Sequence, residues 1–421
     1  MPDRTVAPTF KKLQRIQIPR VTSSRLQNGI LLNYINAGTQ PVCKIELIFL
    51  TGKVHEAKPG ISYLTFKMLQ EGTRSLSSFQ IAEKIELTGS YLGIEPGIEH
   101  STIELYFLKN KGSIVIPLLK ELFFESTFPE EELKKVKQIL SQNLKIELEK
   151  TSVVASRLFR KKLFGEMNPY GSFLEPDLIS QITQEDLIDF YQSKITQVSP
   201  EIIASGLIDA EILELLEKNF GERRLNKMGT DNSFEILTDP SREFIEKKSS
   251  SQTSIRIGKF CAKKQDVDFH KLFITNEILG GYFGSRLMQN IRENKGLTYG
   301  IYSNIVTTLS NGYIVIGADA KKELRDKVIE EVFKEIDLLT AEGVSEEELS
   351  TVRNYLFGEF LGDVNTPFNL ADKFKSVRLH GLGYEFYDKY FETLESITSQ
   401  EIQATAQKYL DKSRMVVIGV G

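Results

Sequence analysis

The spacing of apolar residues predicts the same order of strand and helix in both halves of the chain. Every second side chain of residues 103–107 and 313–317 falls on one face, and both segments are rich in aromatic and β-branched residues, as in half-buried strands. Residues 114–124 and 325–338 follow with apolar positions three to four apart, which predicts amphipathic helices packed against those strands.

One helix start also occurs twice, about half the chain apart. Residues 128–133 read FPEEEL and residues 344–349 read VSEEEL. Pro129 suits a first helical turn, Ser345 and Glu348 form an S-x-x-E capping box, and three glutamates match the positive end of a helix dipole. We infer two copies of one unit.

The repeat predicts an α+β fold of two homologous domains, each a mainly antiparallel sheet packed against helices. The first domain is expected over residues 1–228 and the second over residues 238–421. Residues 223–240 between them contain glycine, asparagine, serine and proline with weak periodicity, which is typical of a linker.

Composition narrows the function classes. The 421 residues are 41% hydrophobic and 26% charged, with a net charge of -4, so we expect neither nucleic acid nor a membrane as partner. No apolar run is long enough to span a bilayer, and residues 1–20 lack the apolar core of a secretory signal. Cys43 and Cys261 are far apart in the sequence, so a reducing compartment, the cytoplasm, is expected.

A helix is predicted from Gly60 to Gly72, with two apolar faces. Its first stripe consists of Ile61, Leu64, Thr65 and Met68, and its opposite stripe of Tyr63, Phe66, Lys67 and Gln70. Two aromatic residues on the second stripe have two explanations. The helix is covered on both sides, or the second stripe lines a cavity or a partner surface.

This segment resembles the signature helix of the pitrilysin, insulinase and mitochondrial-processing-peptidase family, G-x-x-H-x-x-E-H-x-x-x-x-G-T. Gly60, Gly72 and Thr73 match at the right spacing, and Gly52 and Glu56 match residues that precede the helix in relatives. The resemblance extends over roughly residues 25–421, and it implies the processing-peptidase α/β roll and a clamshell dimer.

In that family two histidines of the helix bind zinc and the glutamate between them is the general base. The resemblance places Tyr63, Lys67 and Phe66 at those three positions. The third ligand of relatives, a glutamate, aligns with Lys134, or with Glu132 or Glu131 if the register slips. None of the first three residues can replace an imidazole or a general base. The four histidines, His55, His100, His270 and His380, are also far apart in sequence, so no zinc is expected in this chain.

A second motif lies in residues 285–299, where a short helix over 285–293 is expected to turn into a strand that starts at residue 297. Arg292 and Tyr299 flank that turn. They could be structural, with Arg292 capping carbonyl groups and Tyr299 packed. The segment resembles the family's second signature, S-R-L-x-x-x-x-R-x-x-x-G-L-x-Y, which implies that Arg292 and Tyr299 contact substrate and the developing oxyanion of a zinc-bearing subunit.

These resemblances imply a non-catalytic, zinc-free subunit of a heterodimeric peptidase, which supplies Arg292 and Tyr299 in trans. The expected partners are a homologous subunit with H-x-x-E-H, which holds the zinc, and unfolded or short peptides that add as a strand to the partner's sheet edge. The isolated chain could also form a homodimer. The alternative is a structural or peptide-holding homologue without hydrolytic activity. An active homodimeric zinc enzyme is excluded by the missing histidines.

Overall fold

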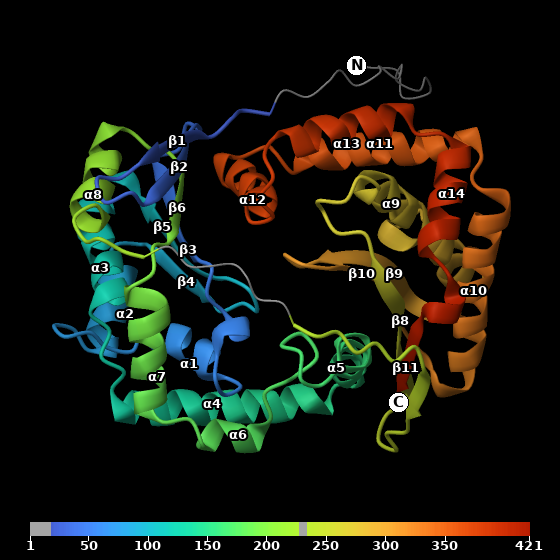
Figure 1. Cartoon of the computed structure of the whole chain (residues 1–421), viewed down its shortest axis with the longest axis horizontal. Helices are drawn as coiled ribbons and strands as arrows, with labels where there is room; N and C mark the ends of the chain where they lie inside the picture. The colour runs from blue at the N-terminus through green and yellow to red at the C-terminus, as the bar shows by residue number, and fades with distance from the viewer. Residues whose placement is uncertain (1–17, 227–233) are drawn as a thin grey trace, which may run out of the picture.

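Two β-sheets, one in each half of the chain, face each other across the molecule (Figure 1). The computed structural model describes residues 18–226 and 234–421. The predicted linker includes residues 227–233, which lie outside the described residues, so the predicted domain boundary stays a prediction.

The first half contains both the first sheet and the helix with the zinc-signature resemblance. In chain order its elements are β1 (Thr22–Arg25), β2 (Leu31–Asn36), β3 (Val42–Phe49), η1 (Lys53–His55), α1 (Ile61–Met68), α2 (Ser78–Leu87), β4 (Tyr91–Glu95), β5 (Ser101–Leu108), η2 (Lys109–Lys111), α3 (Gly112–Phe124), α4 (Glu130–Glu149), α5 (Thr151–Phe164), α6 (Pro176–Ser180), α7 (Gln184–Tyr191), η3 (Gln192–Thr196), β6 (Glu201–Gly206) and α8 (Ala210–Phe220).

The second half follows a similar order. Its elements are β7 (Arg242–Ile245), β8 (Gln252–Cys261), α9 (Phe269–Asn276), η4 (Glu277–Gly281), η5 (Met288–Asn294), β9 (Thr298–Thr307), β10 (Gly312–Lys321), η6 (Lys322–Leu324), α10 (Arg325–Glu342), α11 (Glu346–Gly362), α12 (Pro367–Arg378), α13 (Glu385–Ser396), α14 (Ser399–Tyr409), η7 (Lys412–Arg414) and β11 (Val416–Val420).

The strand orders of the two sheets confirm the predicted α+β fold with two similar halves. The first sheet runs β1-β2-β6-β3-β5-β4 and the second β7-β11-β8-β10-β9. Apart from β1, the strands correspond one to one. Each sheet has one parallel pair, β2 with β6 and β7 with β11, next to antiparallel neighbours. The two sheets are therefore mainly antiparallel, as the repeat predicted.

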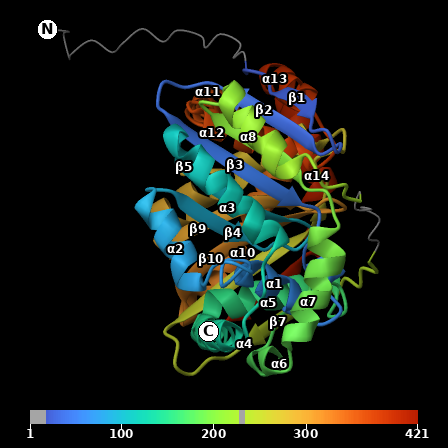
Figure 2. The same ribbon diagram turned by 90° about the vertical axis from the view of Figure 1, so that its left-hand side faces the viewer.

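The central strand β3 is buried on both faces, so each face needs a cover. On one face Phe49 packs against Phe66 of α1 and Phe123 of α3, with ring centroids 5.7 and 5.1 Å apart. On the other face Ile48 joins Leu370 and Phe374 of α12, a helix of the second half. Figure 2 shows α2, α3 and α8 in front of the first sheet and the C-terminal helices behind it.

The second sheet is in turn covered by a helix of the first half. Helix α5 of the first half packs across β8 and β11 of the second sheet, where Phe159 and Leu163 join Val416 and Ile418 in one apolar cluster. Helix α5 follows α4 just as α12 follows α11. The two corresponding helices, α5 and α12, therefore each pack on the sheet of the other half (Figure 1).

Charges as well as apolar contacts hold α12 on the first sheet. Lys44 of β3, only 2% exposed, lies 3.2 Å from both Glu46 and Asp372. Lys375 of α12 in turn lies 2.5 Å from Glu46. Burial, the largest effect, lowers the pKa of Lys44, but attraction to Glu46 and then Asp372 outweighs it, and the pKa is raised above its ordinary value. The Lys44 ammonium is thus charged and satisfied at the junction of the halves.

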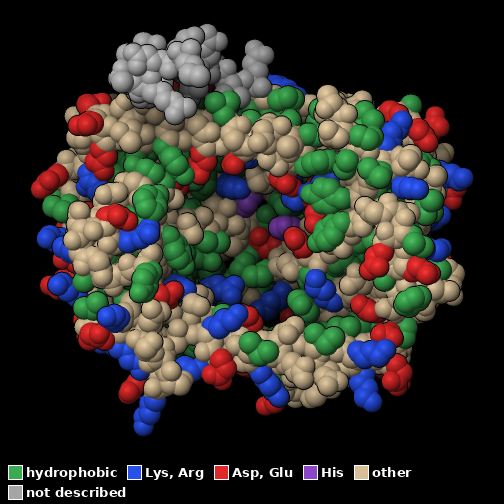
Figure 3. Space-filling view, turned by 180° about the vertical axis from the view of Figure 1, so that it is seen from behind, with side chains coloured by type: hydrophobic (Ala, Val, Ile, Leu, Met, Phe, Trp, Pro, Cys, Tyr) green, Lys and Arg blue, Asp and Glu red, His purple; other side chains and the backbone are tan. Residues whose placement is uncertain are grey.

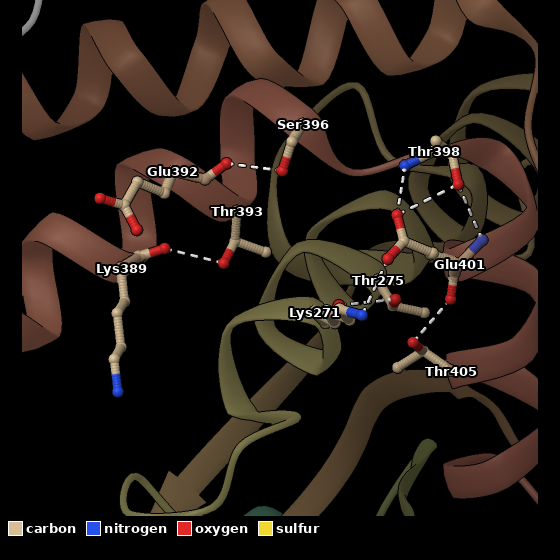
Figure 4. Close-up of polar contacts among 9 residues, drawn as sticks. All are labelled: Lys271, Thr275, Lys389, Glu392, Thr393, Ser396, Thr398, Glu401 and Thr405. Carbon is tan, nitrogen blue, oxygen red and sulfur yellow. Dashed lines mark hydrogen bonds and ion pairs between the residues drawn. The ribbon is translucent and has the colours of Figure 1, made fainter.

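Polar contacts at helix ends fix the helices of the second half. Thr398 caps α14 together with Glu401, and Glu401 also binds Lys271 of α9 at 2.8 Å (Figure 4). Ser345 caps α11 by accepting the N–H of Glu348, as predicted. The reciprocal side-chain bond of the predicted capping box does not form, because the Glu348 carboxylate binds Arg286 instead, at 2.8 Å.

Across the two described ranges, no helix combines the length and apolar character that crossing a membrane would require.

The buried ion pairs among Lys44, Glu46, Asp372 and Lys375, which we call the Lys44 cluster, yield a stability prediction. Lys44→Met keeps most of the apolar stem but leaves the buried Glu46 with Lys375 as its closest cation, so we expect a loss of about 3 kcal/mol in the free energy of unfolding. Urea denaturation measures it. Lys84→Met, at an exposed site on α2, is the matched control and should change stability by about 0.5 kcal/mol or less. A loss as small for Lys44 would refute the role of the cluster.

Candidate functional site

Helix α1 starts where the signature resemblance requires a glycine. Gly60 adopts φ 97°, a left-handed conformation that favours glycine, and an added Cβ would lie 2.9 Å from Leu174. The carboxylate of Glu56 accepts the N–H of Ser62, 3.1 Å away, in the first turn. Burial raises the pKa of Glu56, although N–H donors at Gly60 and Ser62 oppose the shift. The two matching residues therefore position the helix.

Phe66 belongs to the hydrophobic core. Its side chain is 0% exposed and its ring packs against Phe49. The explanation in which the helix is covered on both sides is therefore right for Phe66, and the idea that Phe66 lines an open chamber is wrong. Tyr63, one turn earlier on the same stripe, is 38% exposed. The second stripe is thus closed at Phe66 and open at Tyr63.

Lys67 is bound to the edge of the first sheet. Its ammonium donates to the carbonyl oxygen of Ile94 in the edge strand β4, 2.6 Å away. Burial lowers the pKa of Lys67, and the carboxylate of Glu95 opposes that shift. A protonated amine offers no lone pair to a metal, so this position ties α1 to β4 instead of holding an ion.

The position of the third ligand also lacks a suitable donor. Lys134 is exposed and lines a depression of about 600 Å³ formed by α4, α6 and the start of α7, and no residue of α1 lines it. Glu132 pairs with Lys135 at 2.8 Å, and Glu131 is exposed. None of the three candidates is part of a ligand set with Tyr63 or Lys67.

The residues around α1 therefore do not fit zinc. Tyr63, Phe66 and Lys67 supply a phenol, a hydrocarbon ring and an ammonium, whereas catalytic zinc takes neutral imidazoles, thiolates and carboxylates. In the part of the chain that the structure describes, no group of three or more His, Cys, Asp or Glu residues could hold a metal ion.

The tertiary structure brings two of the four histidines together from opposite halves. Burial, then Lys264, then His100 lower the pKa of His380 to about 4. His270 is separate from that pair. Its ring lies 4.4 Å from that of Phe386, and burial, assisted by Lys389, lowers its pKa to about 4. Burial thus lowers the pKa of His270 and of His380 below the ordinary value.

The second motif contains the short helix predicted over 285–293, and most of it is π-helical. Helical structure begins at Arg286, and η5 is π-helical from Met288 to Asn294. Arg286 binds Glu348 at 2.8 Å and the carbonyl of Gly343 at 2.7 Å. The first arginine of the motif thus anchors the turn to the start of α11.

Arg292 and Tyr299 lie on an open surface of the second half. The Arg292 guanidinium lies 5.0 Å from the ring centroid of Phe283 and 3.5 Å from Glu293, and no carbonyl acceptor is found for it among the described residues. Tyr299 is 86% exposed, at a break in the β9–β10 register. The structural reading, in which Arg292 caps carbonyl groups and Tyr299 packs, does not describe this arrangement.

An exposed aromatic patch beside Arg292 was missed by sequence reasoning. Phe283 is 61% exposed, and Tyr282 stacks on Tyr355 of α11 with ring centroids 4.6 Å apart. Such patches mark interaction surfaces. Tyr282 and Phe283 were visible within the motif, but Tyr355 comes from an element that only the fold brings beside them.

One chain does not unite the two motifs. Helix α1 packs mainly against α7, α4 and β4 of the first half, whereas η5 packs mainly against β9 and α10 of the second half. They lie on opposite sides of a hollow between the halves, which Figure 3 shows lined by apolar and charged side chains. Fold and site together define a two-domain protein of metallopeptidase type whose metal helix has lost its ligands.

Comparison with known proteins names that class. Residues 32–168 match the insulinase (peptidase family M16) model, and residues 181–356 match the peptidase M16 inactive domain. The chain belongs to the peptidase M16 family, as a member of the inactive type.

Individual relatives span nearly the whole chain. The "Uncharacterized zinc protease YmxG" of Bacillus subtilis (strain 168) is 22% identical over 386 residues, covering 91% of this chain and 94% of the relative. The "Non-peptidase homolog YmxG" of Helicobacter pylori is 27% identical over 312 residues, covering 71% of this chain and 70% of the relative. A crystal structure of a peptidase M16 inactive domain from Pseudomonas fluorescens superposes with a TM-score of 0.85 at 22% identity, covering 95% of this chain and 98% of that one.

Burial of Phe66 predicts a large effect of its removal. Phe66→Ala should lower the free energy of unfolding by about 3–5 kcal/mol, because it leaves a cavity against Phe49. Chemical denaturation measures the loss. Phe79→Ala, at an exposed site on α2, is the control and should cost about 0.5 kcal/mol or less. Equal losses for the two variants would contradict the packing of α1.

The neutral His270 predicts a pH dependence of stability. Its pKa is about 4 in the fold and 6.5 unfolded, so below pH 6.5 only the unfolded state takes up the proton and stability falls as pH drops. The contribution reaches about 2 kcal/mol at pH 5. His270→Phe should remove that part of the loss in urea unfolding between about pH 5 and 6.5. Phe386→Leu, which changes the same cavity without removing a titrating group, should keep the slope.

Proposed function

We propose that this chain is the zinc-free subunit of a heterodimeric peptidase and that it supplies Arg292 and Tyr299 in trans to a homologous H-x-x-E-H-bearing partner. The observation that supports the proposal is the contrast between the two motifs. The metal helix is closed by Phe66 and tied to β4 by Lys67, whereas Arg292 and Tyr299 are accessible to another molecule.

The chemistry of the two side chains suits that role. A guanidinium and a phenol hydroxyl donate hydrogen bonds to a peptide carbonyl and to the oxyanion that forms from it. The metal, the base and the attacking water would belong to the partner subunit. The Arg292 guanidinium lies 5.0 Å from the Phe283 ring centroid, a cation–π contact on the exposed surface of the chain.

The edge strand β4 supports the proposal that the substrate peptide pairs with the partner's sheet and not with the sheet of this chain. A peptide that adds as a strand needs free carbonyl and N–H groups at a sheet edge. In this chain the carbonyl of Ile94 on that edge is already occupied by Lys67. A helix that covers a sheet edge is a common means of blocking strand addition, and here α1 does so through Lys67. The substrate peptide would accordingly pair as a strand with the partner's sheet. This chain would contact the side of the peptide that faces Arg292.

A second candidate is a peptide-holding homologue without any hydrolytic partner. It is favoured by the description of the Helicobacter pylori relative as a non-peptidase homologue. The two candidates share the zinc-free chain and the exposed Arg292 and Tyr299, and they differ in whether a catalytic partner exists.

The test is reconstitution with a homologous H-x-x-E-H chain from the same genome. The complex should hydrolyse an unstructured peptide, with zinc in the partner and far less than one equivalent in this chain when each is analysed alone. Arg292→Ala and Tyr299→Phe should each lower kcat by about 10². Both variants should keep the stability and partner affinity of the parent, because their side chains are not packed in a core.

Tyr91→Phe, an exposed tyrosine on β4 of the opposite half, is the matched control and should leave kcat unchanged. Full activity of both Arg292 and Tyr299 variants would remove these residues from the mechanism. Peptide binding by the chain, with no hydrolysis in any reconstituted complex, would favour the peptide-holding homologue.

A further inference from the structure

Three cationic side chains surround a single phenylalanine ring beside the start of α1. Relative to the Phe173 ring centroid, the ammonium of Lys53 lies at 5.4 Å and the guanidinium carbons of Arg157 and Arg160 lie at 5.0 and 4.6 Å. Lys53 comes from η1, both arginines from α5, and Phe173 from the loop between α5 and α6. We call this group the Phe173 cation cluster.

The cluster has more hydrogen-bond donors than acceptors. Lys53 donates to the carbonyl of Ser172 at 2.5 Å, and Arg157 donates to the carbonyl of Leu174 at 3.0 Å and to Glu175 at 3.2 Å. For Arg160, neither a carboxylate within ion-pair distance nor a hydrogen-bond acceptor is found among residues 18–226 and 234–421. Its five N–H donors therefore have no hydrogen-bond acceptor in those ranges, although Tyr313 is close enough to favour the charged guanidinium electrostatically.

Nearby carboxylates do not balance the charge at Arg160. Glu175 is more than half exposed and binds Arg157. Glu56, which acts on Lys53, is directed at the N–H of Ser62. Burial lowers the pKa of Lys53 to about 8, with Glu56 opposing the shift and Arg160 and Arg157 adding to it. The three cations repel one another in a partly buried site, which is unfavourable unless an anion joins them.

The cluster lies between the start of α1 and helix α5, two elements that border the hollow in Figure 1. The loop that carries Phe173 packs on the start of α1, since Leu174 contacts Gly60, and α5 closes the lower side of the hollow in Figure 1. Figure 3 shows Lys and Arg side chains gathered along that lower wall. Lys53, Arg157, Arg160 and Phe173 are all partly accessible.

We propose that the Phe173 cation cluster binds a carboxylate of the peptide held in the hollow, with Arg160 as the principal ligand. This deepens the proposed function and rests on its peptide-binding part. A guanidinium presents two parallel N–H groups that match a carboxylate, and Lys53 adds a point charge. The carboxylate comes either from an Asp or Glu side chain or from the peptide C-terminus. The site would make this chain select acidic or short, carboxylate-ended segments.

Calorimetry with matched peptides tests the site on the full chain and on the reconstituted complex. The four probes are an unstructured acetylated peptide with one Glu or one Gln, each with a free or an amidated C-terminus. The probe that carries the recognised carboxylate should bind roughly ten-fold tighter than the Gln amide, as for one charge-assisted contact. Arg160→Ala should abolish that preference without weakening the Gln amide, and Arg160→Lys should retain part of it.

An experiment without peptide separates anion binding at the cluster from peptide binding. In thermal unfolding at equal ionic strength, acetate should raise the Tm above that in chloride by about 1 °C in the parent chain and not in Arg160→Ala. Arg242→Ala, which removes a guanidinium stacked on Phe333 in the other half, is the control and should keep the acetate effect.

Each failure has a separate reading. Equal affinity for all four peptides, with no acetate effect, overturns the anion site and leaves the proposed function standing. No binding of any peptide, with an acetate effect that depends on Arg160, overturns peptide holding and shows an anion site of another purpose, so the peptide carboxylate is rejected as its ligand. Loss of stability in Arg160→Ala without a carboxylate effect in the parent identifies a purely structural cluster.

Discussion

Each sheet of this protein has two apolar faces, and the helices of its own half cover only one of them. Strand β3 is buried along almost its whole length, including Lys44 and Glu46. The remaining face is covered by a helix lent from the other half, α12 on the first sheet and α5 on the second. Exposing either face would cost roughly 25 cal/mol for each Å² of apolar surface. The exchange therefore fixes the two halves relative to each other.

That fixed arrangement creates the surfaces on which function depends. Because α5 and α12 bridge the halves at opposite ends, a hollow remains between them, with α1 on one side and β9 on the other. The same bridging helix α5 presents Arg157 and Arg160 to Phe173 next to the start of α1. One helix thus carries both the apolar contacts with the second sheet and the two arginines of the Phe173 cation cluster.

The two family motifs differ in what they retain. At α1, Phe66 stands where relatives have the general base and Lys67 where they have a zinc ligand, and both make other contacts, Phe66 with Phe49 and Lys67 with the Ile94 carbonyl. These contacts stabilise the helix without any ion. At η5, Arg286 anchors the turn through Glu348, whereas Arg292 contacts only Phe283 and Glu293 among the described residues. Arg292 is partly exposed, so another molecule can reach it.

The sequence alone determined the repeat, the α+β class and the replacement of the signature histidines and glutamate by Tyr63, Lys67 and Phe66, because strand alternation, helix starts and residue chemistry are local properties. It located Arg292 and Tyr299, but not their exposure, and it left open whether Phe66 was core or chamber. It also predicted a short helix at η5, but not that the helix is of the π type. Only the tertiary structure decided the helix exchange, the pairing of Lys44 with Asp372 and the Phe173 cation cluster. Each of these features joins residues that are far apart in the chain. The pattern of apolar residues in a sequence indicates that one face of a strand or helix is buried, but not which segment covers that face.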